Sequence, residues 1–398
     1  MAHSRRPTKQ RHAQSRATWL GLVIVVGVIT FGYLVQQGYI DLSAVLARIG
    51  VDPAAVGLPV TPEPAVSSGG DAGAIEVFFT TPHLIYPDVA ANRIAPPHER
   101  ALLADLNSAA RTLDLALYEY DLPSIAAALV QAQSRGVEVR LALDRENLDD
   151  PEMAEWAGMV EAAGIPIAWE TSDAFQHSKF VIVDQRLVWT GSWNATINDT
   201  YRNNNNLLRI TLPAIVANYQ AEFERFFSGT FSNSKSGDTP YPAVRLGNIS
   251  IENYFSPRER VAPQVINWID RARTSVHFLA FSFTSDDVGD ALIRRRQAGI
   301  VVRGVFERRN ANGIGSEYDR LRNNDVAALS DGNCYTMHHK VIVIDSRIVI
   351  TGSYNFTGRA EDVNDENLLI IDDPLIAQAF EAEFARVYQQ AQTPLRCG

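Results

Sequence analysis

Two stretches of the chain decide its fold: "HSKFVIVDQRLVWTGSWNATI" at residues 177–197 and "HHKVIVIDSRIVITGSYNFTG" at residues 338–358. Each begins with a histidine, places a lysine two positions later, and enters an apolar, β-branched run typical of a buried strand. Each then turns into a second such run that ends in Gly-Ser-x-Asn. Polar side chains at the start of a buried strand must face something other than the core. Their recurrence after 161 residues indicates a duplicated unit.

The duplication extends beyond the two motifs. Residues 113–147 align with residues 276–310 at a constant offset of 163, and both segments read as strand, helix, glycine and strand. Gly136 and Gly299 stand where the two helices should end, a position that favours a left-handed residue. The next matched pair, which also reads as helices, is "YQAEFERFF" at 219–227 and "FEAEFARVY" at 380–388.

Short β-branched runs that alternate with helical stretches predict an α/β fold. We expect two similar halves, residues 75–235 and 248–398, with mixed, largely parallel sheets that are buried on both faces. Duplication alone could mean no more than a stable pseudo-dimer, so the function depends on which residues are duplicated.

The duplicated residues form a chemical pattern, His-x-Lys-x4-Asp followed by Gly-Ser-x-Asn. Residues i and i+2 of an extended strand point to one face, so His177 and Lys179 should project together, as should His338 and Lys340. One histidine near one lysine is usually structural, whereas two copies in register favour a shared site. The chain holds only four lysines against 32 arginines, and two of the four lie in the motifs. This bias indicates that the site requires lysine and not merely a cation.

This constellation resembles the phospholipase D superfamily, whose hallmark is the same motif in two copies that meet at a pseudo-twofold axis. The resemblance covers residues 75–392. It implies a duplicated phospholipase D-like fold and cleavage of a phosphodiester through a phosphohistidine, with no metal and no cofactor. One motif histidine would be the nucleophile and the other the general acid. The residues that it assigns to binding phosphate oxygens are Lys179, Lys340, Ser192, Asn194, Ser353 and Asn355.

The two halves differ at one position of the family pattern. A carboxylate usually follows each motif histidine by 28 residues and binds its other ring nitrogen. Glu366 fills this place for His338, whereas Asn205 fills it for His177. A carboxylate favours the protonated imidazole, so we expect His338 to be the general acid and His177 the nucleophile. The motif aspartates, which lie at the far end of each strand and read as structural, are Asp184 and Asp345.

The N-terminus predicts a membrane anchor. Residues 1–16 carry five cations and no acid, and an apolar stretch follows at residues 17–36. This length is about enough to span a bilayer as one helix, with the basic tip in the cytoplasm and the rest exported. A cleaved signal peptide would have a shorter apolar core, and a buried core helix seldom starts with five cations. Residues 37–74 are rich in Pro, Gly, Ser and Ala and read as a tether.

The expected anchor and the charge of the chain bear on the choice of substrate. The anchor and the net charge of −10 favour a phospholipid at a membrane surface, which would be hydrolysed to phosphatidic acid and its headgroup. The alternatives are an endonuclease of the same superfamily and a non-catalytic phosphate-binding scaffold, although two complete motifs argue against the scaffold. A set of arginines could track a nucleic-acid backbone or be a solvated face. These are Arg294, Arg295, Arg296, Arg303, Arg308, Arg309, Arg320 and Arg322.

Two further features bear on the environment and the assembly. Cys334 and Cys397 lack metal-ligand spacing, and the sequence allows either one bridge between them or two free thiols. Since both motifs lie in one chain, we expect a monomer.

Overall fold

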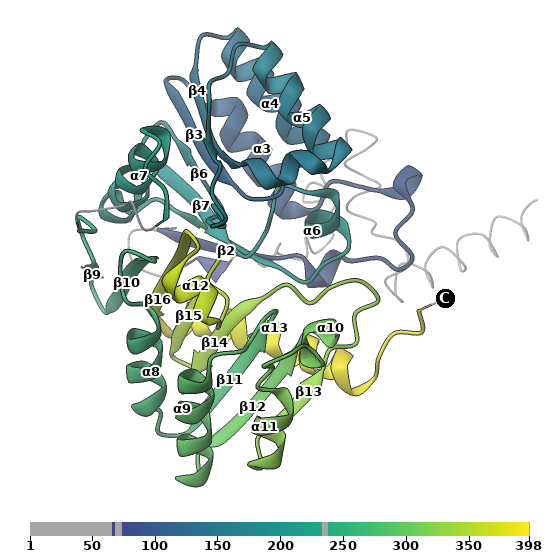
Figure 1. The fold of residues 1–398 in the computed structure, drawn as a ribbon, viewed down its shortest axis with the longest axis vertical. Helices are drawn as coiled ribbons and strands as arrows, with labels where there is room; N and C mark the ends of the chain where they lie inside the picture. Colours follow the sequence, from purple (N-terminus) through teal and green to yellow (C-terminus); the bar gives the residue numbers. More distant parts are fainter. Residues whose placement is uncertain (1–65, 68–73, 233–237, 398) are drawn as a thin grey trace, which may run out of the picture. The chain divides into compact units, whose positions relative to one another are not determined.

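A computed structural model of the protein describes residues 66–67, 74–232 and 238–397 (Figure 1). The expected basic tip, the anchor and most of the tether lie outside these described residues. Within the described part, no helix combines the length and the apolarity needed to cross a bilayer.

The first half is built on an eight-stranded sheet with the order β1-β2-β8-β7-β6-β3-β4-β5. Its strands are β1 (Val66–Ser67), β2 (Ile75–Phe79), β3 (Thr112–Leu117), β4 (Glu138–Asp144), β5 (Ile167–Glu170), β6 (Phe180–Val183), β7 (Leu187–Gly191) and β8 (Asn206–Ile210). Its helices are η2 (Thr81–His83), η3 (Ala90–Asn92), α3 (Pro97–Ser108), α4 (Pro123–Ser134), η4 (Arg145–Asp149), α5 (Pro151–Ala162), α6 (Ile197–Tyr201) and α7 (Pro213–Phe227).

The second half repeats this plan, with the strand order β13-β12-β11-β14-β15-β16-β10-β9. Its strands are β9 (Ala243–Leu246), β10 (Ile249–Ser256), β11 (Ser275–Ala280), β12 (Val301–Phe306), β13 (Ala327–Ser330), β14 (Lys340–Ile344), β15 (Ile348–Gly352) and β16 (Glu366–Asp372). Its helices are α8 (Ala262–Asp270), α9 (Asp286–Gln297), α10 (Arg308–Ala311), α11 (Tyr318–Asn323), α12 (Gly358–Asp362) and α13 (Pro374–Gln392). The duplicated α/β fold is thus confirmed.

The prediction of largely parallel sheets is wrong. Only β3-β4-β5 and β11-β12-β13 pair in parallel, and the other neighbours in both sheets are antiparallel. The tight turn after each motif strand makes one such pair in each sheet antiparallel, β6-β7 and β14-β15. Asp184 and Gln185 have φ of 51° and 55°, and Asp345 and Ser346 have φ of 53° and 50°. Positive φ at both central residues is typical of a type I′ hairpin turn, which can join only antiparallel strands.

The helix ends and the core follow the sequence pattern. Gly136 and Gly299 have φ of 87° and 86°, which confirms them as left-handed residues just after α4 and α9. Figure 1 shows α3, α4 and α5 together on one side of the first sheet. The opposite side faces a central core that both halves share, in which α7 contributes Phe226 and α13 contributes Phe380. The two sheets are therefore parts of one folding unit.

The cysteines form a disulfide. Cys334 and Cys397 are bonded, with their Cα atoms 5.4 Å apart, and they are separated by 63 positions in the chain. The bridge joins the segment after α13 to the loop that leads into the second motif. Of the two alternatives that the sequence allowed, the structure has the bridge.

Candidate active site

The two halves exchange backbone hydrogen bonds where the motifs begin. Gln176 pairs with Asp365 and Asn204 pairs with Met337 in short parallel bridges. The N–H of His177 donates to the carbonyl of Asp365 at 2.9 Å, and the N–H of His338 donates to the carbonyl of Asn204 at 2.9 Å. Each motif histidine is therefore held by backbone from the opposite half. The motif side chains of both halves lie close enough to affect one another's pKa.

An aromatic side chain covers each motif pair. Tyr118 follows β3, and its ring centroid lies 4.7 Å from the imidazole of His177 and 5.1 Å from the motif lysine Nζ. Phe281 follows β11 and takes the same place over His338, at 4.7 Å from the imidazole and 4.5 Å from the lysine Nζ. Since one ring touches both the histidine and the lysine of its half, the two side chains share a face, as the i, i+2 spacing predicts.

The two lysines are nearly closed off from solvent. Lys179 and Lys340 are 2% and 1% exposed, and each Nζ donates to the backbone carbonyl of its own motif histidine, at 2.7 Å and 2.9 Å. Burial lowers the pKa of Lys179 to about 8, and burial together with the Lys179 ammonium lowers the pKa of Lys340 well below its usual value. An anion bound between them would favour both ammonium ions, because it would offset this desolvation and repulsion.

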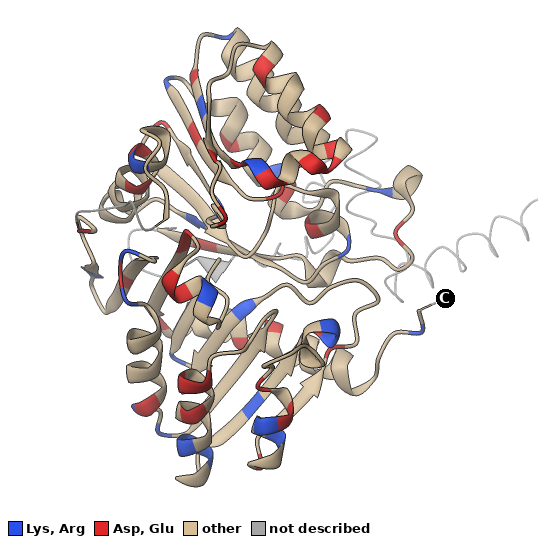
Figure 2. Ribbon diagram, viewed as in Figure 1, with Lys and Arg blue, Asp and Glu red and all other residues tan. Residues whose placement is uncertain are grey.

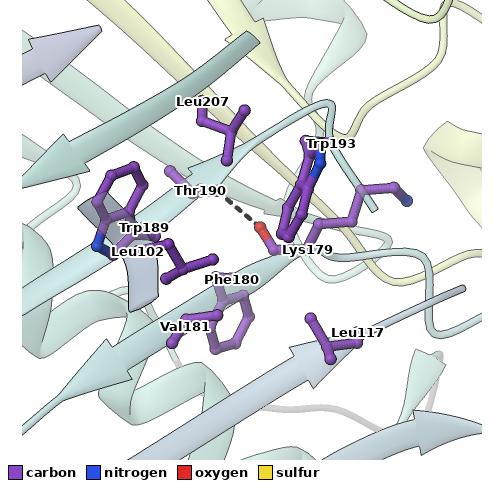
Figure 3. Close-up of a pocket in the computed structure, with 9 residues that line it drawn as sticks. All are labelled: Leu102, Leu117, Lys179, Phe180, Val181, Trp189, Thr190, Trp193 and Leu207. Carbon is purple, nitrogen blue, oxygen red and sulfur yellow. Dashed lines mark hydrogen bonds between the residues drawn. The ribbon is translucent and has the colours of Figure 1, made fainter. Parts of the chain in front are cut away.

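Lys179 reaches the site past the core of its own half. Its aliphatic stem runs beside Trp193, next to a small apolar cavity of about 10 Å³, and its Nζ points away from that cavity (Figure 3). Thr190 holds the backbone of Lys179, because its hydroxyl donates to the Lys179 carbonyl at 3.1 Å. This cavity is too small for a substrate and is part of the packing behind the site.

The expected partners of the histidines are exchanged. The prediction that Glu366 binds His338 is wrong: Glu366 Oε2 lies 2.8 Å from His177 Nδ1. Asn205 Oδ1 lies 3.0 Å from His338 Nδ1. The cause is the crossing of the chain between the halves. Asn204 pairs with Met337 in the other half. The residues that follow them in the chain, Asn205 and His338, are therefore neighbours.

His177 and Glu366 form a buried pair. Burial raises the pKa of Glu366 to about 8, against the lowering effect of the Lys179 ammonium and of the Ser353 hydroxyl. Burial and the two motif lysines lower the pKa of His177 well below its usual value. Since Nδ1 faces Glu366, Nε2 is the ring nitrogen that remains to attack a substrate.

His338 instead faces an ionised carboxylate that the sequence pattern did not single out. Asp199 Oδ2 lies 3.3 Å from His338 Nδ1. Burial disfavours the ionised Asp199, but His338 and hydrogen bonds from Asn203 and Asn194 lower its pKa below the usual value. Burial lowers the pKa of His338 to about 4, and Asp199 opposes this fall. Asp199 thus gives His338 the negative neighbour that had been expected of Glu366.

The two motif serines lie behind the site. Ser192 and Ser353 are fully buried, and a Cβ on the preceding Gly191 would come 2.3 Å from a backbone oxygen of β8. The Ser192 hydroxyl donates to Asn205 Oδ1 at 2.8 Å, and Ser353 Oγ accepts the N–H of Asn367 at 2.9 Å. Both hydroxyls are thus engaged with neighbouring residues of the protein, and their expected contact with phosphate stays a prediction.

Asn194, a predicted phosphate ligand, binds a carboxyl that sequence reasoning missed. Its Nδ2 donates to Glu119 Oε2 at 3.0 Å, and its Oδ1 is buried with no partner among the described residues. Asn355 in the second half also has a buried Oδ1 without a described partner. Glu119 aligns with Ser282 at the offset of 163, so the acid is present in one half only. Comparison of the two matched segments could have revealed Glu119, because only one of them has an acid at this position.

Glu119 makes the site sensitive to pH. Burial and the nearby Asp199 raise its pKa to about 7, while Lys179 and Lys340 oppose the rise. Above pH 7 the Glu119 carboxylate should repel an anionic substrate and keep its hydrogen bond from the Asn194 amide. We expect KM to rise about tenfold between pH 6 and pH 8 and Glu119→Gln to remove most of that rise.

The control for this measurement is Glu155→Gln on α5, an exposed carboxyl outside the site. It should keep the KM profile of the unmodified protein. If Glu119→Gln retained the same rise of KM with pH, the titrating group would have to be another one.

The motif aspartates support the fold. The Asp184 carboxylate accepts the backbone N–H groups of Ala110, Arg111 and Thr112 at 2.7–3.2 Å. Asp345 does the same in the second half, at residues 273–275. Each carboxylate ties its hairpin turn to the start of the neighbouring strand, away from the histidines.

No group of three or more His, Cys, Asp or Glu side chains is arranged to hold a metal ion in residues 66–67, 74–232 and 238–397. Positive charge in the site comes from the two lysines.

Comparison with known proteins matches both halves. A family model described as "Cardiolipin synthase, PLD-like domain" matches residues 102–227 and 265–388. The mitochondrial cardiolipin hydrolase of Xenopus tropicalis is 35% identical over 120 residues, which are 30% of this chain and 57% of that protein. The phospholipase D of Rickettsia felis is 29% identical over 188 residues, which are 45% of this chain and 94% of that protein. The chain spans little more than half the length of the cardiolipin hydrolases it matches.

A solved structure shares the fold over most of the chain. Phosphatidylserine synthase from Haemophilus influenzae Rd KW20 has a TM-score of 0.58, with 12% identity over 80% of this chain and 87% of that chain. At this identity the likeness concerns the fold alone.

Proposed function

Because the chain belongs to the family of phospholipase D-like domains, we propose that it is a metal-independent phosphodiesterase that acts through a phosphohistidine. The observation that carries the proposal is the meeting of both His-x-Lys motifs in one site, each held by backbone from the opposite half. The arrangement offers a nucleophile, an acid and two fixed cations, which together are sufficient for this reaction.

We propose different roles for the two histidines. Nε2 of His177 attacks phosphorus, and a new N–P bond forms as the P–O bond to the leaving alcohol breaks. His338, whose Nδ1 faces the Asp199 carboxylate, acts as the general acid and gives a proton to the departing oxygen. His338 then accepts a proton from water, which attacks the phosphohistidine and frees His177. Lys179 and Lys340 stabilise the charge that develops on the non-bridging oxygens.

Phospholipid is the proposed substrate, cleaved to phosphatidic acid and its headgroup. The relatives named phospholipase D and cardiolipin hydrolase support this choice, as does the negative net charge. The second candidate is endonuclease activity, since the exposed arginines of the second half remain compatible with a polyanion.

The test is turnover by the full-length protein, purified in mild detergent, in the presence of a chelator. We expect it to release phosphatidic acid from vesicles of phosphatidylcholine or cardiolipin and to cleave bis(p-nitrophenyl) phosphate. Single- and double-stranded DNA serve as competing substrates. Activity that disappeared in chelator and returned with a divalent cation would contradict metal independence. Rapid cleavage of DNA without lipid hydrolysis would favour the nuclease.

We also propose that residues 17–36 anchor the protein and that the enzyme lies on the extracytoplasmic side of the cell membrane. The disulfide between Cys334 and Cys397 supports this placement, because such bonds persist mainly in oxidising compartments. A reporter that is active only after export should be active when it is fused after Gly398. Activity of a cytoplasm-specific reporter at the same position would refute the placement.

A further inference from the structure

Glu119 holds a carboxyl at the site that no cation pairs with among the described residues. The other two carboxyls, of Glu366 and Asp199, are buried against the two motif imidazoles. Glu119 is half-buried, and its Oε2 accepts a hydrogen bond from the Asn194 amide at 3.0 Å, which is a neutral donor. The charge of this carboxylate is therefore available to act on a ligand that enters the site.

The backbone carries Glu119 in one place. The next residue, Tyr120, forms a short parallel bridge with Ala195, and the N–H of Asp121 donates to the Ala195 carbonyl at 3.1 Å. These contacts join the segment after β3 to the segment that follows the first Gly-Ser-x-Asn. The carboxyl is thus held on fixed backbone beside Asn194, a predicted phosphate ligand.

Charged groups of both halves lie near this carboxyl. Burial raises its pKa, and the charged groups that also act on this pKa are Asp199, Lys179, Lys340 and Asp121. Burial lowers the pKa of both motif lysines, and the Glu119 carboxylate is one of the groups that oppose this effect. Glu119 is therefore within electrostatic reach of the place where the two ammonium ions would hold a phosphate group.

The second half keeps the backbone of this place but not the acid. Ser282 corresponds to Glu119 at the offset of 163. Phe283 forms the same parallel bridge, with Phe356, that the first half forms here. The N–H of Phe356 donates to the Ser282 carbonyl at 3.1 Å. Since a serine occupies equivalent backbone, the fold does not require an acid at this position, and an electrostatic role accounts for Glu119.

Charge on the outer helices does not provide such a role. Figure 2 shows acidic and basic residues together on α9 and α11. Arg294 is paired with Asp270 at 2.9 Å. Arg320 is paired with Glu317 at 2.6 Å. Paired opposite charges largely cancel at a distance, and salt screens what remains beyond about 10 Å. The choice between two anions therefore depends on charges within the site.

We propose that Glu119 makes the site select a phosphodiester over a phosphomonoester and thereby favours release of the product. A diester carries one negative charge, whereas a phosphate monoester carries about 1.5 to 2 at pH 7. Hydrolysis of the phosphohistidine leaves a monoester between the lysines. This inference rests on the proposed function, in which the product is that monoester.

The size of the selection follows from the charges. Coulomb repulsion is proportional to the charge of the ligand, so its free energy doubles from a monoanion to a dianion. A carboxylate that weakens binding of a diester about tenfold therefore weakens binding of a dianionic monoester about 100-fold. Ionised Glu119 should change the preference between them about tenfold in favour of the diester.

The experiment uses two ligands that have no ester bond to cleave. Methylphenylphosphinate is a monoanion like the diester, and phenylphosphonate is mostly a dianion at pH 8, like the product. Calorimetry at pH 8 gives their dissociation constants for the full-length protein, Glu119→Gln and Glu119→Ser. We expect both variants to bind the phosphinate about tenfold and the phosphonate about 100-fold more tightly than the unmodified protein. Glu119→Ser installs the residue of the second half and guards against a local defect of the glutamine variant.

The matched control is Glu146→Gln, an exposed carboxyl that follows β4 at the same end of the sheet. It should leave the ratio of the two dissociation constants unchanged. An unchanged ratio in both Glu119 variants would overturn the proposal, as would an equal change in Glu146→Gln, because the selection would then come from diffuse charge. If Glu119 governed the ratio but the unmodified protein cleaved no phosphodiester, the proposed reaction would fail while the selection by Glu119 stood.

Discussion

His338→Asn is expected to release nitrophenol from a nitrophenyl phosphodiester in one burst, stoichiometric with the enzyme, and then to stall. Nitrophenolate departs without needing a proton, so His177 can still attack and form the phosphohistidine. No base then remains to activate water. Steady-state turnover should fall by about 10³-fold or more, in line with the loss of a general acid–base group.

The reciprocal variant gives the control. His177→Asn should show no burst with the same substrate, and mass spectrometry of the stalled His338→Asn protein should find the phosphate on His177. A label on His338, with the burst in His177→Asn, would reverse the roles. The structure changes the basis of this assignment, because the negative neighbour of His338 is Asp199 and Glu366 faces His177.

Lys179→Arg and Lys340→Arg should each lower kcat by about 10²–10³-fold although the charge is kept. Each ammonium is buried, lies near an aromatic ring and donates to a histidine carbonyl at 2.7 Å or 2.9 Å. The planar fork of arginine is wider than an ammonium, and in this enclosed place it would displace the ring or the histidine backbone.

Lys340→Met separates shape from charge, since methionine is unbranched but neutral. We expect Lys340→Arg to be nearly as inactive as Lys340→Met, with both proteins unfolding within a few degrees of the unmodified one. Near-normal turnover of either arginine variant would show that the lysines provide only a diffuse positive potential.

The duplication, the motif faces and the helix ends could be predicted from the sequence. The duplication follows from matched segments at a constant offset, the faces from the i, i+2 spacing, and the helix ends from glycines. The strand directions could also have been read from it. A three-residue link between Val183 and Leu187 leaves no room for the crossover that parallel strands require. The prediction gave more weight to the alternation of strands with helices than to this turn, and so it was wrong.

The partners of the histidines could not be read from spacing. The residue 28 positions after a motif histidine lies at the same distance along the chain whether it contacts that histidine or the histidine of the other half. Only the tertiary pairing of Asn204 with Met337 decides between them. Glu119 was missed for a related reason: comparing the halves drew attention to what they share, and this acid matters because only one half has it.

The crossing of Asn205 and Glu366 between the halves bears on how such a site can diverge. In a dimer of identical chains every substitution appears twice, and symmetry keeps the two histidines alike. Once both halves are encoded in one gene, a change at position 205 alters only the environment of His338, and a change at position 366 alters only that of His177. Covalent fusion of the halves thus allows natural selection to make one imidazole a better acid and the other a better nucleophile. The same crossing means that neither half can drift alone, because each carries the residue that orients the other's histidine.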